Sequence, residues 1–251
     1  MTGVLPVALN DATKVIQALL KAGKEYVGVM KLHGDVDEDR IREVFNEFQG
    51  KIYQKPPLRS SVKRIIRVRT IYYMDVLEIE ERNVLFKVGC EAGTYIRKLI
   101  YDMGKVFGCG AHMYELRRTR AGPFAEDESM VTLHDMLYLY TKWHETGDIR
   151  MLRRFILPME RALLLLPKVF IRDSAVDAIC HGAHLTAPGI THVEAGIKPS
   201  DKVAILTLKG EAVALGTAVA SSEEMLKATH GIMVKTDRVL MPRGTYPKLW
   251  R

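Results

Sequence analysis

Residues 83–107 read NVLFKVGCEAGTYIRKLIYDMGKVF, and this stretch decides the fold of the first half of the chain. Its first part, Asn83 to Cys90, predicts a strand. After Gly93, apolar residues recur at helical spacing and predict a helix. They are Ile96, Leu99, Ile100, Met103 and Phe107. Residues at such strand–helix junctions often point into a cleft, so this junction is a candidate functional position.

Outward from this stretch, strands and helices mix in an irregular order. Tyr26 to Leu32 predicts a strand, Asp35 to Phe48 a helix, and Val62 to Ile79 two strands or one bent strand. Upstream, Asn10-Asp11 predicts the N-cap of a helix that ends at Gly23. Because no regular βαβ repeat is present, the sequence predicts an α+β domain.

The second half of the chain has a different pattern. Leu133 to Trp143 and Ile149 to Leu157 predict two helices. Beyond residue 167, short strands such as Val203 to Leu208 and Ala212 to Ala220 are bounded by turn signals, which predicts a small β-barrel. We therefore expect two domains, residues 1–165 and residues 166–251.

The composition favours an anionic partner. Lys and Arg total 37 against 30 Asp and Glu, a formal charge of +7. This balance is typical of nucleic-acid binding, although a basic enzyme with no polyanion partner would share it. The three cysteines, Cys90, Cys109 and Cys180, are far apart and odd in number, so we expect reduced thiols in a cytosolic protein and no structural zinc site. The longest aliphatic run, Ala162 to Leu166, is too short to cross a bilayer.

Two basic clusters are candidate RNA-binding residues. The first contains Lys63, Arg64, Arg67 and Arg69, and the second contains Arg117, Arg118 and Arg120. In an extended chain Lys63, Arg67 and Arg69 share one face, and a row of cations suits a phosphate backbone. A charged edge strand that resists aggregation would show the same pattern. The presence of two clusters favours RNA or DNA binding.

The junction after Cys90 contains two residues whose side chains could take part in binding or catalysis. Tyr95 could stack on a base or transfer a proton, and Arg97 could hold a carboxylate in a bidentate pair. The alternative is an ordinary surface Tyr and Arg on the first turn of a helix. The residues alone favour this alternative.

Six ordered motifs resemble one family, and the likeness covers essentially the whole chain. They are Thr2-Gly-Val-Leu-Pro-Val-Ala-Leu9, Gly23-Lys-Glu-Tyr-Val27, Pro56-Pro-Leu-Arg-Ser60, Glu91-Ala-Gly-Thr-Tyr-Ile-Arg97, Gly110-Ala-His112 and Glu115-Leu-Arg-Arg-Thr-Arg120. Together they are similar to the dyskerin family in its archaeal branch, the RNA-guided pseudouridine synthase of H/ACA ribonucleoproteins. Lys168 to about Thr245 resembles the PUA domain of that family. The resemblance implies an α+β synthase fold with a mixed sheet and a small C-terminal barrel.

The resemblance also implies an activity, the isomerisation of uridine to pseudouridine in rRNA and possibly tRNA, with no metal and no organic cofactor. The target base would be splayed out of its helix into a pocket. Tyr26 would stack on this base, and Tyr95 would lie against it and help to remove the C5 proton. Arg97 would pair with the catalytic aspartate, and Leu116 would form the floor of the pocket. The implied partners are guide RNA, substrate RNA and small H/ACA proteins in an archaeal cytoplasm, with neither DNA nor a membrane.

The C-terminal region contains a further candidate RNA contact. A short helix predicted at Ser174 to Cys180 runs into the turn His181-Gly182-Ala183, where small residues let a backbone approach RNA closely. We expect residues 174–189 to form the RNA-facing side of the barrel. A plain tight turn is the alternative.

The sequence departs from the family at one position. The family's nucleophilic aspartate lies in a Gly-Thr-Leu-Asp-Pro turn just before the segment that matches Thr2 to Leu9, and the sequence contains no such motif. We therefore expect this chain alone to be inactive and Arg97 to be a partly buried cation, relieved by solvent, an anion or another acid. A stand-alone tRNA pseudouridine synthase and a non-catalytic RNA-binding scaffold are the alternative functions.

Overall fold

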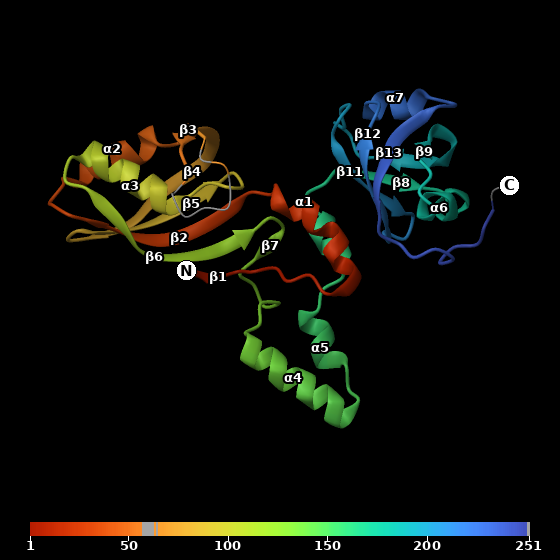
Figure 1. Ribbon diagram of the computed structural model, residues 1–251, viewed down its shortest axis with the longest axis horizontal. Helices are drawn as coiled ribbons and strands as arrows, with labels where there is room; N and C mark the ends of the chain where they lie inside the picture. Colours follow the sequence, from red (N-terminus) through yellow and green to blue (C-terminus); the bar gives the residue numbers. More distant parts are fainter. Residues whose placement is uncertain (57–62, 64, 250–251) are drawn as a thin grey trace. The chain divides into compact units, whose positions relative to one another are not determined.

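The chain divides into two compact units in a computed structural model that describes residues 1–56, 63 and 65–249 (Figure 1). Unit 1 comprises Met1–Pro6 and Leu20–Phe155, and unit 2 comprises Val7–Leu19 and Ile156–Arg251. Each unit has its own sheet and its own buried core. This mixture of sheets and helices confirms the predicted α+β class. The domain boundary at residues 165 and 166 stays a prediction.

Unit 1 is built on a seven-stranded sheet with the order β1-β6-β2-β5-β4-β3, and β7 pairs with β6. The strands are β1 (Thr2–Gly3), β2 (Lys24–Leu32), β3 (Gly50–Gln54), β4 (Arg67–Glu80), β5 (Asn83–Cys90), β6 (Ala111–Ala121) and β7 (Phe124–Ala125). All neighbours are antiparallel except β1, which runs parallel to β6. The sheet is therefore mixed, as the family resemblance implies.

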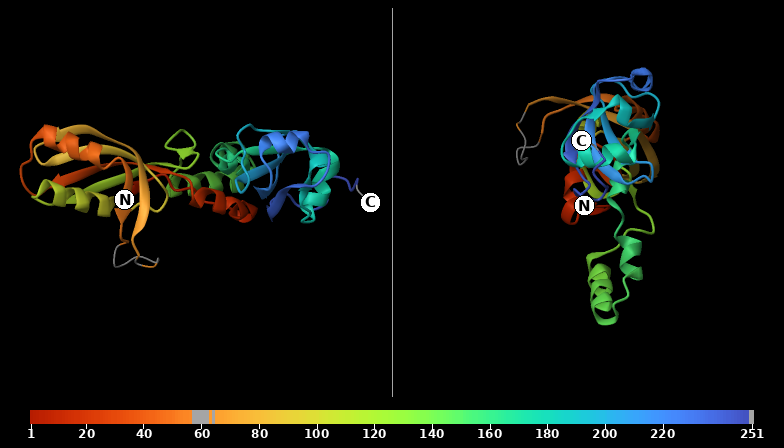
Figure 2. Two further views of the ribbon diagram at one scale, coloured as in Figure 1. Left: turned by 90° about the horizontal axis from the view of Figure 1, so that it is seen from above. Right: turned by 90° about the vertical axis from the view of Figure 1, so that its right-hand side faces the viewer.

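Two helices, α2 (Glu38–Glu47) and α3 (Ile96–Phe107), cover one face of this sheet (Figures 1 and 2). Alternate residues of β2 are buried, because side chains alternate between the faces of a strand. The helices contribute Ile41, Val44, Phe45, Leu99, Ile100 and Met103 to the same core. The apolar spacing that predicted these two helices thus reflects a single buried layer.

One strand, β4, begins within the first basic cluster at Arg67 and runs to Glu80, just before β5. β4 shows two register shifts against β5, the first between Ile71 and Tyr73 and the second between Val76 and Glu78. Such irregularities bend a strand locally. The bent-strand alternative for this region is therefore confirmed over Arg67–Glu80.

The N-terminal helix differs from the prediction. Asn10–Val15 forms a 3-10 helix (η1), and only Ile16–Leu20 (α1) is α-helical. Asn10 has φ 46°, and Leu9 is the N-cap residue without a side-chain bond. Asp11 is ion-paired with Lys14 at 2.9 Å. The predicted Asn10-Asp11 cap was wrong, because Asn10 and Asp11 lie within the first turn of the 3-10 helix and Leu9 is the N-cap residue.

Two further helices, α4 (Leu133–Thr146) and α5 (Arg150–Phe155), pack against each other. The Thr132 side chain caps α4 by accepting a hydrogen bond from the Asp135 N–H at 3.1 Å. Both predicted helices are confirmed, with ends shifted by a few residues. Among the described residues, no helix is sufficiently long and apolar to span a membrane.

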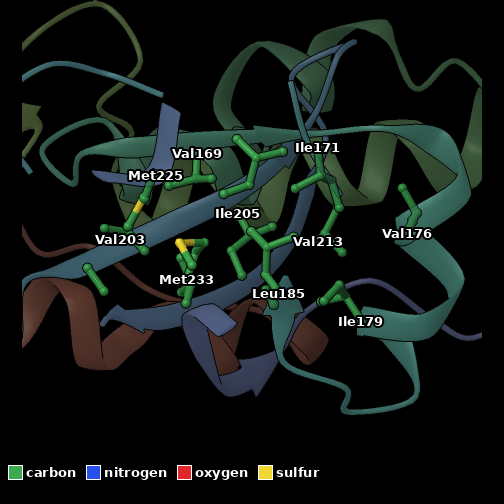
Figure 3. Close-up of a cluster of buried hydrophobic side chains, with 14 of the residues drawn as sticks. Val169, Ile171, Val176, Ile179, Leu185, Val203, Ile205, Val213, Met225 and Met233 are labelled. Atoms are coloured by element: carbon green, nitrogen blue, oxygen red, sulfur yellow. The ribbon is translucent and has the colours of Figure 1, made fainter. Parts of the chain in front are cut away.

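Unit 2 contains a six-stranded sheet with the order β10-β8-β11-β12-β13-β9. The strands are β8 (Lys168–Ile171), β9 (Leu185–Thr186), β10 (Ile190–Val193), β11 (Lys202–Thr207), β12 (Ala212–Ala218) and β13 (Ile232–Val239). The helical segments are η2 (Met159–Leu163), α6 (Asp173–Cys180), η3 (Ala187–Gly189) and α7 (Ser222–Lys227). Strand residues such as Val169 and Ile205 and helix residues such as Ile179 fill one core (Figure 3). This near-barrel matches the predicted C-terminal unit.

Candidate functional site

The junction between β5 and α3 is a tight turn that positions Tyr95. Gly93 has φ +80°, a conformation that favours glycine. The N–H and the hydroxyl of Thr94 donate to the Glu91 carbonyl at 3.2 and 2.7 Å. Tyr95 follows as the N-cap residue of α3, and it is half-buried. The backbone of the turn therefore fixes where the Tyr95 side chain begins.

Gln54, the last residue of β3, holds the Tyr95 backbone from the other side. Its side-chain amide oxygen accepts from the Tyr95 N–H at 3.0 Å, and its amide N–H donates to the Tyr95 carbonyl at 3.2 Å. Gln54 is only 3% exposed. The sequence analysis missed this residue, because a glutamine in a short edge strand has no distinguishing local pattern.

Glu91 anchors the start of the same turn to β4. Its carboxylate accepts from the Thr70 N–H at 3.1 Å and from the Arg69 guanidinium at 3.3 Å. Arg69, a predicted RNA contact, is therefore engaged within unit 1. The junction is held at Glu91 by β4 and at Tyr95 by β3.

Tyr26 and Leu116 lie in the buried core next to this junction. Both are 8% exposed, and both belong to the cluster that includes Ile96, the residue between Tyr95 and Arg97. A Cβ at Gly28 would be 2.9 Å from the Leu116 side chain, so a small residue is needed there. The structure thus brings Tyr26 and Leu116 into one cluster that reaches the start of α3.

Arg118 on β6 is the residue paired with Tyr26 on β2. Burial raises the pKa of the Tyr26 phenol, and the nearby Arg118 guanidinium opposes that rise. The Arg118 Nε also donates to the Val4 carbonyl at 2.6 Å, and the Val4 N–H donates to the Arg118 carbonyl at 2.7 Å. Arg118 therefore joins Tyr26 to the N-terminal segment of the chain.

Arg97 differs from the expectation. It is exposed rather than partly buried, and it forms no ion pair with any residue that the structure describes. The reason is its position on the solvent side of the first turn of α3, one residue after the buried Ile96. Solvent exposure relieves the charge, which is one of the three outcomes expected.

The other basic residues occupy different environments. Lys63 is exposed, and Arg67 lies on β4 opposite Gln54 in the register. Arg117 is ion-paired with Glu126. Arg64, like residues 57–60 of the Pro56-Pro-Leu-Arg-Ser60 motif, lies outside the described residues. Of the predicted RNA-binding cations, Arg69 and Arg117 are therefore already paired with carboxylates of the protein, which leaves them less available to a phosphate.

Arg120 belongs to a polar network around Glu25. The Glu25 carboxylate accepts from the Thr119 hydroxyl at 2.8 Å and from Tyr73, and lies 3.2 Å from Lys87 and 3.5 Å from Arg120. Burial raises the pKa of Glu25, but hydrogen bonds from Tyr73, Thr119 and Lys87 outweigh it and lower the pKa overall. Because Glu25 precedes Tyr26 in β2, this network faces the opposite side of the sheet.

In unit 2, the predicted turn follows α6 directly. The His181 Nδ1–H donates to the Asp177 carbonyl at 2.8 Å, and the Ala183 N–H donates to the Ala178 carbonyl at 3.1 Å. Gly182 has φ +92°, and a Cβ there would meet nothing within 4 Å. The turn thus presents open space beside its backbone. Among the described residues, no group of three or more His, Cys, Asp or Glu could hold a metal ion.

Three family models match consecutive parts of the chain. The N-terminal domain of the TruB family of pseudouridylate synthases matches residues 1–96, and the C-terminal domain of tRNA pseudouridylate synthase B matches residues 97–164. The PUA domain matches residues 167–240. The three matches cover nearly all of the chain in order.

Curated archaeal proteins and solved structures are similar over the full chain. Probable tRNA pseudouridine synthases B from Methanopyrus kandleri and Pyrococcus abyssi are 62% and 59% identical; each alignment covers 100% of this chain and 74% or 75% of the relative. A Cbf5–Nop10–Gar1 complex contains a chain of 60% identity with TM-score 0.95, covering 98% of this chain and 75% of that one. An H/ACA ribonucleoprotein bound to a substrate RNA containing 2'-deoxyuridine gives 58% identity and TM-score 0.93, covering 99% and 75%.

Proposed function

Because the chain belongs to the TruB family of pseudouridine synthases, within its archaeal Cbf5 (dyskerin) branch, we propose that it is the catalytic subunit of an RNA-guided pseudouridine synthase. The main support for this proposal is the similarity to Cbf5 chains over the whole length. It agrees with the position of Tyr95, which is held by Gln54 next to the cluster that contains Tyr26 and Leu116. In the reaction, the bond from uracil N1 to the ribose C1′ breaks, the base turns, and C5 bonds to C1′. C5 then loses its proton and N1 gains one, so the composition of the nucleoside is unchanged.

The described residues support a division of roles in this reaction. Tyr26 stacks on the flipped base above the apolar floor that Leu116 provides. Tyr95, half-buried at the start of α3, lies against the base and assists removal of the C5 proton. Arg97, exposed and without an ion pair to a described residue, is available for a carboxylate.

The partners and the cellular location that we propose for this chain are based on the same similarity to archaeal Cbf5 proteins. One similar Cbf5 structure contains Nop10 and Gar1, and another contains substrate RNA, so we propose guide RNA, substrate RNA and comparable small proteins as partners of this chain. Residues 166–251 act as the RNA-binding PUA domain, with the 181–183 turn at its RNA-facing side. The archaeal relatives and the reduced cysteines favour action in the cytoplasm.

The nucleophile is the one component that we do not assign to a residue of the chain. The sequence contains no Gly-Thr-Leu-Asp-Pro motif, and we infer that none of its aspartates takes the place of the family's nucleophile. We propose that a polypeptide of residues 1–251 supplies RNA binding and most of the pocket but not the nucleophile.

A second candidate function, stand-alone modification of tRNA, is favoured by the names of the curated relatives, which are called tRNA pseudouridine synthases B. The test is pseudouridine formation in an rRNA fragment and in tRNA, each with and without guide RNA. The assay uses residues 1–251 and, in parallel, the same chain preceded by a family Gly-Thr-Leu-Asp-Pro segment. Guide-dependent product supports the main proposal, and guide-independent tRNA product supports the second. Binding without product from either chain supports a non-catalytic scaffold.

A further inference from the structure

We propose that Gln54 is a positioning residue that fixes Tyr95 in the active site, a role that rests on the function proposed for Tyr95. The side-chain amide of Gln54 forms both an accepted and a donated hydrogen bond with the peptide groups of Tyr95, at 3.0 and 3.2 Å. This two-bond pattern is the one that two backbones exchange in an antiparallel sheet. The Gln54 side chain therefore pairs with the peptide groups at the start of α3 in the way that a neighbouring strand would.

The environment of Gln54 makes this pair specific. Gln54 is 3% exposed, so water cannot readily replace a lost bond. A buried amide needs both an acceptor and a donor opposite it, and the Tyr95 peptide groups supply both. Only a side chain with this geometry and dual capacity can satisfy the two peptide groups of Tyr95 from β3.

The peptide groups of Tyr95 are constrained on several sides. The Tyr95 carbonyl also accepts from the N–H groups of Lys98 and Leu99, at 3.0 Å each, which begins α3. The Tyr95 side chain itself forms no capping hydrogen bond with α3. Gln54 is thus the contact that holds the Tyr95 N–H, and it sets the direction of the Cα–Cβ bond from which the ring extends.

The second anchor of the junction, at Glu91, allows the effect of Gln54 on Tyr95 to be separated from an effect on the start of the turn. Glu91 is held by Thr70 on β4 independently of Gln54. Loss of the Gln54 pair should therefore loosen Tyr95 while the start of the turn stays in place. The expected consequence is weaker recognition of the target base with unchanged binding of the RNA backbone.

The test compares two RNAs that differ at one position. A guide–substrate duplex with one unpaired target uridine and the same duplex with an abasic site there are titrated with residues 1–251. The ratio of the abasic Kd to the uridine Kd reports recognition of the base. We expect Gln54→Leu to lower this ratio to that of Tyr95→Ala without weakening abasic binding, and to accelerate hydrogen exchange at the Tyr95 amide about tenfold.

The matched control is Gln49→Leu, because Gln49 also donates its amide to a backbone carbonyl, that of Met74 at 3.4 Å, but does not touch the junction. It should keep the parent ratio and the parent exchange rate at Tyr95. If Gln54→Leu also keeps them while Tyr95→Ala lowers the ratio, the positioning role of Gln54 is overturned. If Tyr95→Ala itself keeps the parent ratio, the proposed function of Tyr95 fails, and the role of Gln54 fails with it.

A conservative variant keeps the test valid if Gln54→Leu does not fold. In Gln54→Glu, a protonated carboxyl can both accept from the Tyr95 N–H and donate to its carbonyl, whereas a carboxylate can only accept. The ratio should therefore be low at neutral pH and recover as the pH falls through the pKa of the new carboxyl. A ratio in the folded Gln54→Glu variant that equals the parent's at every pH would contradict the proposal.

Discussion

The ring of Tyr73 on β4 lies directly across Gly89 on β5, so closely that a Cβ at Gly89 would be 2.3 Å from the ring carbons. Gly89 is also the register partner of Glu25 on β2. The missing side chain at Gly89 lets the Tyr73 hydroxyl pass over β5 and donate to the Glu25 carboxylate. A glycine inside a strand here allows a close approach that spans three strands.

Gly89→Ala should therefore destabilise unit 1, because the added methyl group cannot coexist with the Tyr73 ring. We expect the free energy of unfolding to fall by about 1–3 kcal/mol, the usual cost of overpacking. Urea denaturation measures this change. The control is the same substitution in a Tyr73→Ala background, where the cost should largely disappear; an equal cost in both backgrounds would show that the ring is not the obstacle.

The Glu25 network predicts a pH dependence of stability. Burial raises the pKa of Glu25, but hydrogen bonds from Tyr73, Thr119 and Lys87 lower it below its ordinary value. A lowered folded-state pKa stabilises the folded protein above the unfolded pKa, about 4.3, and that contribution is lost as the pH falls through the folded pKa. Glu25→Gln should be less stable at neutral pH and lose less stability on acidification. Parallel Tm curves for both proteins from pH 7 to pH 3 would contradict this.

Much of the fold could be predicted, because the periodicity of apolar residues reports burial directly. The α3 residues recur at helical spacing because they face the sheet, and β5 agrees with the prediction from Asn83 to Cys90. The strand β6 was not predicted as a strand. Its charged segment, Arg117 to Arg120, hides the alternation, since its cations are satisfied by Glu126, Val4 and Tyr73 after folding.

The site was less predictable than the fold. The residues alone mark the junction before α3 as a candidate position but favour an ordinary surface role for Tyr95 and Arg97, so the functional prediction for both depends on the family motif. Gln54 becomes visible only when β3 is placed next to the start of α3. Contacts between residues 41 positions apart depend on tertiary packing, which a local pattern does not encode. For the same reason the sequence did not reveal that Arg69 is engaged by Glu91.

The first basic cluster predicts a salt-dependent RNA contact at Lys63 and Arg67. Each phosphate contact that is lost should flatten the dependence of log K on log salt by about one unit. We expect the Lys63→Ala, Arg67→Ala double variant to have a slope lower by up to about two units than the parent. The matched control removes two charges from α2, Arg40→Ala with Arg42→Ala, whose partners are acidic residues of that helix. Equal slopes in the parent and the Lys63, Arg67 variant would identify the cluster as a charged edge only.

The turn after α6 predicts a position where added bulk blocks RNA. Gly182→Glu should weaken guide-RNA binding, because the new side chain extends into the open space beside the backbone and adds negative charge. Gly210→Glu is a close control, since Gly210 also has a positive φ of +83° and open space around its Cβ position, in the β11–β12 turn. Both variants carry the same backbone strain and charge. Equal affinities for the two folded variants would argue against an RNA-facing role of the 181–183 turn.

The last prediction concerns turnover by residues 1–251. Tyr26 and Leu116, two of the proposed pocket residues, are buried in one cluster, and the backbone of Tyr95, the third, is held by Gln54. Arg97 is exposed without an ion pair to a described residue. Removal of a nucleophile abolishes nearly all of the chemical step, whereas RNA binding depends on other residues and survives. We therefore expect H/ACA-type RNA to bind to this polypeptide without pseudouridine formation.

The chain preceded by the family's Gly-Thr-Leu-Asp-Pro segment should form pseudouridine, and changing the aspartate of that segment to asparagine should abolish the product while leaving affinity intact. Arg97→Ala in the extended chain tests the expected ion pair, and it should lower turnover more than binding, because the lost partner acts on the nucleophile rather than on the RNA backbone. Mass spectrometry of the RNA measures the product in each case. Robust product from residues 1–251 alone would refute the prediction and would require a nucleophile among the aspartates that the chain already contains.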